Sequence, residues 1–204
     1  MKILLFANSD WYLYNFRFAL AQYLRKEGHQ VILLSPPGAY VERLRSQGFR
    51  WMEFDLARRG LNPFQEGLTI LRLFLLYWRE GPDLVHHFTI KCVLYGSFVS
   101  HWVGIKSVVN SVTGLGYVFS TGGGAKNWLR WIAKFLYRLV LRSTTVIFQN
   151  SDDRELFIAH GLVHAENAVL IRSSGVDIDR FSPQPENAGT PIVLFPGRLL
   201  WDKG

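Results

Sequence analysis

Short apolar runs recur along the chain, separated by longer stretches in which apolar residues return every three or four positions. Most of the short runs are almost continuously apolar, which is typical of strands covered by helices on both faces. The longer stretches have the spacing of amphipathic helices, and residues 15–26 show it clearly. Strands are predicted at residues 2–7, 30–35, 50–54, 83–88, 107–112, 144–149, 168–172 and 191–196.

Glycines mark the ends of the predicted helices, namely Gly28, Gly48, Gly81, Gly104 and Gly161. Glycine accepts the left-handed backbone that closes a helix, and each of these residues precedes a new strand or connection. Strands that alternate with helices favour right-handed crossovers. The sequence therefore predicts an α/β fold, a doubly wound Rossmann-like parallel sheet.

Residues 182–190 interrupt this rhythm with proline, glycine and polar residues and show no periodicity, as expected of a linker. We expect an N-terminal domain over residues 1–181, the linker over 182–190, and the first strand and loop of a second domain over 191–204. A lone strand cannot bury both of its faces. The chain is therefore expected to be truncated at the start of that second domain.

Composition supports a folded chain, since 49% of residues are apolar and only 19% are charged. Residues 2–7 run directly into Asn8, unlike a signal peptide. The longest apolar stretch, residues 68–78, contains Arg72 and is about half of the ~20 residues that a membrane span needs. The single cysteine, Cys92, excludes internal disulfides and a thiolate metal cluster. We expect a cytoplasmic protein without a metal site.

The net charge of +7 is concentrated in one segment. Between Asp83 and Asp152 there is no carboxylate, whereas the segment holds Lys91, Lys106, Lys126, Arg130, Lys134, Arg138 and Arg142. A one-sided field of this kind favours anionic partners such as phospholipid head groups, nucleic acid or phosphorylated substrates. The charge alone does not choose among them.

A predicted helix over residues 125–142 carries most of these cations at intervals of four residues. Its apolar half is formed by Trp128, Leu129, Ile132, Phe135, Leu136, Leu139 and Val140, and Trp131, Tyr137 and Leu141 interrupt the cationic half. Basic residues beside interfacial aromatic rings favour an anionic membrane surface. The membrane-facing set would be Lys126, Arg130, Trp131, Lys134, Arg138 and Arg142. The alternative is a helix that covers the sheet and has a solvated basic face. Nucleic acid is not expected, because no helix-turn-helix, RNP or zinc pattern accompanies the charge.

Five stretches carry a family resemblance, at residues 82–87, 113–119, 149–155, 174–181 and 196–204. In this order and spacing they resemble the retaining GT-B glycosyltransferases of family 4, over all 204 residues. The most specific pair is the Gly175-Val176-Asp177 turn with Phe181 and the ending from Gly197-Arg198-Leu199 to Lys203-Gly204. The segments around Arg17 and Thr113 resemble the bacterial branch that extends polyprenyl-diphosphate-linked sugars.

The resemblance implies the N-terminal half of a GT-B fold in a glycosyltransferase. The enzyme would move a hexose or N-acetylhexosamine from a sugar nucleotide to a lipid-linked acceptor in surface polysaccharide synthesis, peripherally on the inner face of the membrane. Arg198 and Lys203 match the family's pair of residues that binds the donor diphosphate. Arg198 can offer a planar guanidinium to the phosphate oxygens, and Lys203 can offer a compact ammonium charge. The family's paired glutamates would lie beyond Gly204, so the chain alone is expected to be inactive.

The acceptor side is expected to include Arg17, His86, His87, Thr113 and Gly114. Arg17 lies one turn into a helix whose N-terminus favours anions, although a surface arginine is an equal alternative. The two histidines end a strand, where ligands bind in open α/β sheets, or else belong to the core or its rim. Gly114 stands where many family members have histidine, and no catalytic residue is assigned.

No cofactor is expected, because the first strand-to-helix turn lacks the glycines of a dinucleotide-binding turn. Two other functions stay open. One is a GT-B sugar-nucleotide epimerase, which has the same two-domain organisation but whose function does not explain the basic helix. The other is a folded half that binds an acceptor or a membrane and has no catalytic activity of its own.

Overall fold

The computed structural model describes residues 1–56, 62–113 and 127–178, except the side chains of 127–133, together with residues 181–183, 185, 189, 190, 193 and 194. The chain divides into two compact units, residues 1–174 and 175–204. The described residues of the second unit contain no helix or strand. Only Val193 and Leu194 of the strand predicted at 191–196 are described; they are exposed and outside the sheet.

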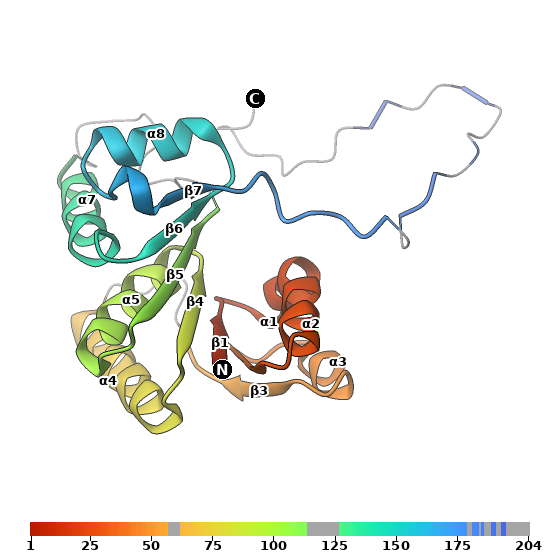
Figure 1. Cartoon of the computed structure of the whole chain (residues 1–204), viewed down its shortest axis with the longest axis horizontal. Helices are drawn as coiled ribbons and strands as arrows, with labels where there is room; N and C mark the ends of the chain where they lie inside the picture. The colour runs from red at the N-terminus through yellow and green to blue at the C-terminus, as the bar shows by residue number, and fades with distance from the viewer. Residues whose placement is uncertain are drawn as a thin grey trace. The chain divides into compact units, whose positions relative to one another are not determined.

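The first unit is built on a parallel sheet of seven strands (Figure 1). The strands are β1 (Lys2–Phe6), β2 (Gln30–Ser35), β3 (Arg50–Glu53), β4 (Leu84–Phe88), β5 (Ser107–Val112), β6 (Thr145–Phe148) and β7 (Ala168–Leu170). Their order is β3-β2-β1-β4-β5-β6-β7, and every pair is parallel. The direction of winding reverses between β1 and β4. The predicted doubly wound α/β fold is confirmed.

Helices return the chain from the end of each strand to the start of the next. They are α1 (Asp10–Tyr12), α2 (Phe18–Lys26), α3 (Val41–Ser46), α4 (Pro63–Glu80), α5 (Ile90–Val103), α7 (Asn127–Leu141) and α8 (Ser151–Ala159), with a π-helical turn η1 (Leu13–Arg17) and a 3-10 turn η3 (Ala165–Asn167). In Figure 1, α1, α2 and α3 lie on one side of the sheet, and α4, α5 and α7 lie on the other. The helix predicted at 15–26 is therefore two elements, a π-helical turn and α2.

The continuous apolar strands supply a separate core on each face of the sheet. Leu5 and Leu33 pack with Leu13 and Ala21 beneath α2, while Leu4 and Ile32 join the cluster of α4 and α5 on the opposite face. Successive side chains of a strand point to opposite faces, so a strand buried on both sides needs apolar residues throughout. This double burial explains why the runs are not alternating.

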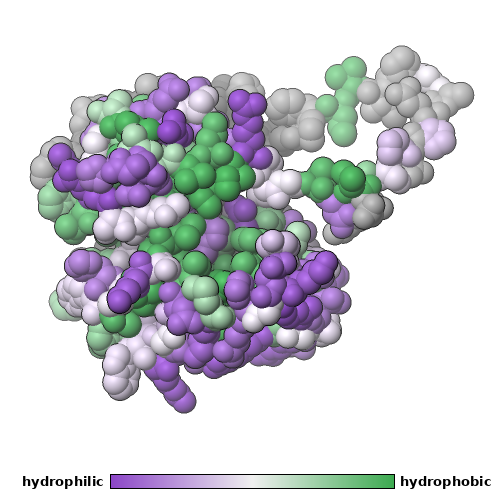
Figure 2. All heavy atoms as spheres, in the orientation of Figure 1, coloured by the Kyte–Doolittle hydropathy of each residue, from purple (hydrophilic) through white to green (hydrophobic). Residues whose placement is uncertain are grey.

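The β5–β7 part of the sheet departs from the expectation of helices on both faces. Val146 and Phe148 are buried in a third cluster with α7 and α8, but Ile147 between them is only half-buried. Val169, Leu170 and Ile171 are exposed, and Figure 2 shows apolar side chains gathered over the area of β6 and β7. Among the described elements, this part of the sheet is covered by helices on one face.

Helix α7 is rotated relative to the orientation that its sequence pattern predicts. Tyr137 and Leu141, expected on the cationic half, are buried with Phe148 and Phe157. Phe135, Leu136 and Leu139, expected in the core, are exposed. The helix has two faces at three-and-four spacing, and the packing of Tyr137 against Phe157, with ring centroids 5.4 Å apart, decides which one is buried.

Candidate acceptor site at the carboxyl ends of the strands

The reversal of strand order between β1 and β4 places a ligand-binding position at the carboxyl ends of these strands. The turn after β1 is fixed by its own polar residues. Ser9 Oγ accepts a hydrogen bond of 3.2 Å from the amide of Tyr12 and caps α1. Asp10 is buried, and its carboxylate accepts bonds from the amides of Trp11 at 2.8 Å and Tyr40 at 2.7 Å. Asp10 therefore holds the loop after β2 in place.

Arg17 ends the π-helical turn and directs its guanidinium toward the carboxyl end of β4. Its Cζ lies 4.5 Å from the ring centroid of Phe88 and 5.3 Å from that of Tyr12. Its Nη2 donates a 2.7 Å hydrogen bond to the Tyr12 hydroxyl. Its Nε is buried and has no hydrogen-bond partner among the described residues. π-Helical turns occur frequently at functional sites, and this one positions a cation that keeps donors available.

His86 lies beside Arg17 on the same face of the sheet. Its ring centroid is 4.1 Å from that of Phe88, and Nε2 is 2.8 Å from Ser111 Oγ at the end of β5. Burial lowers the pKa of His86 well below its ordinary value, and the charges of Arg17 and His87 lower it further. The imidazole is therefore neutral at pH 7. Arg17 remains the cationic partner of this pair, and half-buried Thr113 follows β5 at the same edge.

His87 is fully buried in the core, which is the alternative to a cleft position that the sequence left open for the two histidines. Its Nδ1 lies 2.8 Å from Asn110 Oδ1 and its Nε2 lies 3.0 Å from the Tyr77 hydroxyl, within the core beneath α4 and α5. Burial lowers its pKa to about 4. Adjacent residues on a strand point to opposite faces, so His86 and His87 cannot share one cleft. The alternation of side chains along a strand already predicts this separation from the sequence.

The polar network around His87 extends through Asn110. Ser97 Oγ donates to Asn110 Oδ1 at 2.9 Å, and Asn110 Nδ2 donates to Thr144 Oγ1 at 3.0 Å. These groups are buried and hydrogen-bonded, as buried polar groups must be to avoid a desolvation cost. The network joins β4, β5 and α5 and is a structural feature of the core.

Thr89 is a site feature that the sequence analysis missed. It follows β4 with φ 74° and ψ 154°, a conformation that a β-branched residue rarely adopts. Strained backbone of this kind clusters at ligand-binding positions. Thr89 immediately precedes α5 at the same edge as Arg17 and His86. No residue type in this stretch signals the strain, because threonine is common in ordinary strands.

Several expected site residues lie outside the described part of the chain. These are Gly114, Lys126, Arg198 and Lys203, and the side chains of Arg130 and Trp131. Of the other cations expected at a membrane, Lys134 is half-buried with Nζ 3.2 Å from His160 Nε2, whereas Arg138 and Arg142 are exposed. The structure thus brings together Arg17, His86 and the end of β5, and separates His87 from them.

Two characterised relatives match the sequence. An N,N'-diacetylbacillosaminyl-diphospho-undecaprenol α-1,3-N-acetylgalactosaminyltransferase from Campylobacter jejuni is 26% identical over 219 residues, covering 100% of this chain and 58% of the relative. A UDP-Gal:α-D-GlcNAc-diphosphoundecaprenol α-1,3-galactosyltransferase from Escherichia coli is 23% identical over 125 residues, covering 61% of this chain. The chain spans 58% of the first relative's length and 31% of the second's.

Solved structures share the fold. A glycosyltransferase from Rickettsia africae superposes with a TM-score of 0.64 at 18% identity, over 87% of this chain and 44% of that one. An Anabaena protein in complex with UDP and glucose gives 0.62 at 18% identity, over 91% and 47%. A UDP-N-acetylglucosamine 2-epimerase from Rickettsia bellii gives 0.60 at 16% identity, over 85% and 45%. Because transferases and an epimerase both match, these likenesses establish the fold alone.

The family follows from the sequence match. The model of the family described as glycosyl transferase 4-like matches residues 2–151, a range that contains β1 to β6 and the residues around Arg17 and His86. This agrees with the resemblance carried by the motifs and with the transferase names of both relatives. The chain belongs to the glycosyl transferase 4-like family.

Proposed function

We propose that this chain forms the acceptor side of a glycosyltransferase that moves a hexose or N-acetylhexosamine from a sugar nucleotide to a polyprenyl-diphosphate-linked acceptor in surface polysaccharide synthesis. Family membership supports the reaction class. The names of both relatives support the acceptor class, since each acts on a sugar joined to undecaprenol through a diphosphate. The proposed place of action is the cytoplasmic face of the membrane.

The observation that carries the acceptor assignment is the Nε of Arg17, which has no hydrogen-bond partner in the part of the chain that the structure describes. A buried donor without a partner is costly, and a ligand oxygen would remove that cost. Guanidinium groups bind phosphate oxygens through two parallel N–H bonds. Stacking on Phe88 and the bond to Tyr12 fix the plane of the guanidinium before any ligand arrives. Arg17 is therefore held in advance in an orientation suited to binding the acceptor diphosphate.

Roles are also proposed for His86, Thr113, Gly114, Arg198 and Lys203. His86 is held by Ser111 and stays neutral, so it contributes hydrogen bonding and shape while Arg17 supplies the charge. Gly114, which follows Thr113, would allow the acceptor sugar to approach the backbone closely because glycine has no Cβ. Arg198 and Lys203 are proposed to meet the diphosphate of the sugar nucleotide, where charge develops as the glycosyl bond breaks.

Binding of a short acceptor tests the assignment of Arg17. The probe is a farnesyl-diphosphate-linked N-acetylhexosamine titrated into the 204-residue chain. We expect Arg17→Ala to weaken binding by about tenfold or more, since charged hydrogen bonds contribute about 1.5–3 kcal/mol, and Arg17→Lys to give an intermediate value.

The matched control is Arg45→Ala, which removes an exposed arginine paired with Glu42 on α3. We expect no change in affinity for this variant. Equal affinity of Arg17→Ala and the unaltered chain would remove the basis of the acceptor assignment. A sugar-nucleotide epimerase, by contrast, would convert a free sugar nucleotide and ignore the lipid diphosphate.

A further inference from the structure

Helix α4 has a second apolar face that is exposed in the described part of the structure. Leu73 and Tyr77 are fully buried against the sheet. At about 100° per residue, the opposite side of the helix carries a stripe spaced by four and three positions. The stripe consists of Phe64, Leu68, Leu71, Leu75 and Trp78, and all five side chains are exposed. Phe64 and Trp78 at its two ends are 89% and 70% exposed. A helix that only covers a sheet does not need this stripe.

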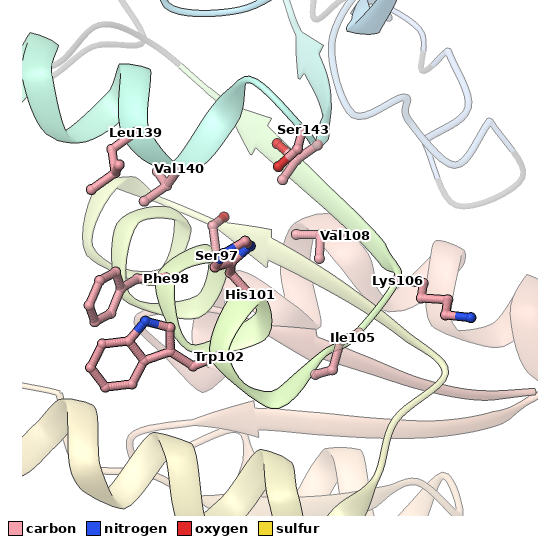
Figure 3. Close-up of a pocket in the computed structure, with 11 residues that line it drawn as sticks. Ser97, Phe98, His101, Trp102, Ile105, Lys106, Val108, Leu139, Val140 and Ser143 are labelled. Atoms are coloured by element: carbon pink, nitrogen blue, oxygen red, sulfur yellow. The ribbon is translucent and has the colours of Figure 1, made fainter.

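The exposed apolar surface continues onto the neighbouring helices. Helix α5 packs between α4 and α7, and its last turn exposes Trp102. Trp102 and Phe98, with ring centroids 4.7 Å apart, line a cavity of about 320 Å³ together with exposed Leu139 of α7 (Figure 3). All three helices run from the carboxyl edge of the sheet to its amino edge. Trp78, Trp102 and Leu139 therefore lie in turns at the same end of their helices.

The cations around this surface are exposed and the carboxylates are mostly engaged. Exposed cations are Arg72, Arg79, Lys106, Arg138 and Arg142. Glu66 of α4 is half-buried and accepts from Lys91 Nζ at 2.6 Å and from the Tyr95 hydroxyl at 2.7 Å. Glu80 is buried and pairs with both terminal nitrogens of Arg50 at 2.7 Å. Asp83 after α4 accepts from the Lys2 amide at 2.6 Å.

We propose that the outer face of α4, with Trp102 of α5 and Leu139 of α7, is the surface by which this protein lies on an anionic phospholipid bilayer. No helix in the described part of the chain is long and apolar enough to cross a membrane. An apolar stripe flanked by cations is the pattern of a helix that lies in the membrane plane. Tryptophan favours the same interfacial depth, and each nearby cation is attracted by anionic head groups.

The cationic charge of this surface favours an anionic bilayer over a second copy of the chain as its partner. The three-and-four spacing of the stripe would also suit pairing of two α4 helices. In a symmetric pair, however, each copy would present the same cationic surface to the other, which opposes association. An anionic bilayer has the complementary charge. The excess of cations therefore favours lipid over self-association.

This surface would also bring a lipid-linked acceptor to the candidate site. The Phe64 end of α4 lies at the carboxyl edge of the sheet, the edge to which Arg17 and His86 belong. An 18-residue helix is about 27 Å long, so the stripe runs from that edge along the flank of the sheet. This part of the inference rests on the proposed function, whereas membrane contact itself does not.

Vesicle co-sedimentation tests the surface without any sugar nucleotide. The probes are vesicles of phosphatidylglycerol and phosphatidylcholine in equal parts, and vesicles of phosphatidylcholine alone. We expect the 204-residue chain to bind the anionic vesicles about tenfold or more tightly and to be released by salt. Leu71→Asp with Leu75→Asp should reduce binding about tenfold, because carboxylates oppose both apolar burial and anionic lipid.

The matched control is Val176→Asp with Ile178→Asp, which places the same two charges on exposed apolar positions outside α4. This variant should retain vesicle binding within about twofold, because added carboxylates weaken binding strongly only on the surface that meets the lipid. A second variant, Arg72→Glu with Arg79→Glu, keeps the stripe intact and should abolish the preference for anionic vesicles. Circular dichroism spectra that match the unaltered chain confirm that each variant is folded.

Three outcomes would overturn the proposal. They are absent binding of the unaltered chain to anionic vesicles, undiminished binding of the leucine variant, and equal binding to both kinds of vesicle. A dimer in analytical ultracentrifugation that the leucine variant separates, without vesicle binding, would assign the stripe to a second copy instead. Each result is independent of acceptor binding by Arg17, so failure of one proposal does not decide the other.

Discussion

The guanidinium of Arg17 lies over the aromatic ring of Phe88, with Cζ 4.5 Å from the ring centroid. Arg17 comes from the helical connection after β1, and Phe88 is the last residue of β4. The contact therefore joins the two strands between which the winding of the sheet reverses. A cation is held at this position by a ring, leaving hydrogen-bond donors for a ligand.

Removal of one hydroxyl tests how strongly this orientation matters. Tyr12→Phe keeps the ring beside Arg17 and deletes the 2.7 Å hydrogen bond to Nη2. A typical hydrogen bond contributes about 0.5–1.5 kcal/mol, so we expect affinity for a farnesyl-diphosphate-linked sugar to fall by about two- to tenfold. Isothermal titration calorimetry measures the change. The exposed Tyr23, changed to phenylalanine, is the control and should leave affinity unaltered.

Stability should fall as the pH is lowered from about 6.5 toward 4. Burial lowers the pKa of His87 from 6.5 to about 4, and that of His86 falls in the same direction. Between these pH values the unfolded chain binds protons that the folded chain does not, so acid favours unfolding. For His87 alone the loss at pH 5 relative to pH 7.5 is about 2 kcal/mol.

Urea unfolding at the two pH values measures this loss. His87→Gln should be less stable at pH 7.5 but should show a smaller loss between pH 7.5 and 5. The same substitution at exposed His101 should keep the full loss. An unchanged pH dependence in His87→Gln would contradict the assignment of the loss to this residue.

Two helical glycines should respond in opposite ways to alanine. A Cβ on Gly96 in α5 would overlap the ring of His87, whereas a Cβ on Gly67 in α4 meets nothing within 4 Å. We expect Gly96→Ala to lower the free energy of unfolding by about 1–3 kcal/mol, as overpacking does. Gly67→Ala should raise it by about 0.5–1 kcal/mol, because alanine is the better helix former. Urea unfolding at pH 7.5 measures both, and a stabilising Gly96→Ala would contradict the described packing of His87.

The sequence pattern was sufficient for the fold because burial on both faces makes the central strands continuously apolar. Continuous apolar runs such as Leu4-Leu5-Phe6 supply one core with every other residue and the opposite core with the rest. The glycines after the helices gave the boundaries, since Gly28, Gly48, Gly81, Gly104 and Gly161 all have positive φ. The role of Arg17 at an acceptor phosphate stays a prediction, and the structure places its guanidinium over Phe88 at the end of β4.

Tertiary structure decided the features that depend on which of two similar faces is buried. In α7 both faces had apolar residues at helical spacing, and only contact with Phe157 selected Tyr137 and Leu141 for the core. In α4 the buried side and the exposed stripe are both apolar, so periodicity could not separate them. The roles of His86 and His87 differ because one faces Arg17 and the other faces Tyr77.

By itself, then, the sequence determined the order of strands and helices, the basic segment and the family, because each is encoded in local spacing and residue type. It did not determine the donors left open on Arg17, the strained backbone of Thr89 or the exposed stripe of α4. The open donors and the stripe are defined by residues distant in sequence or by the lack of a neighbour, and packing in three dimensions alone creates such relationships. The backbone angles of Thr89 carry no signal in its residue type.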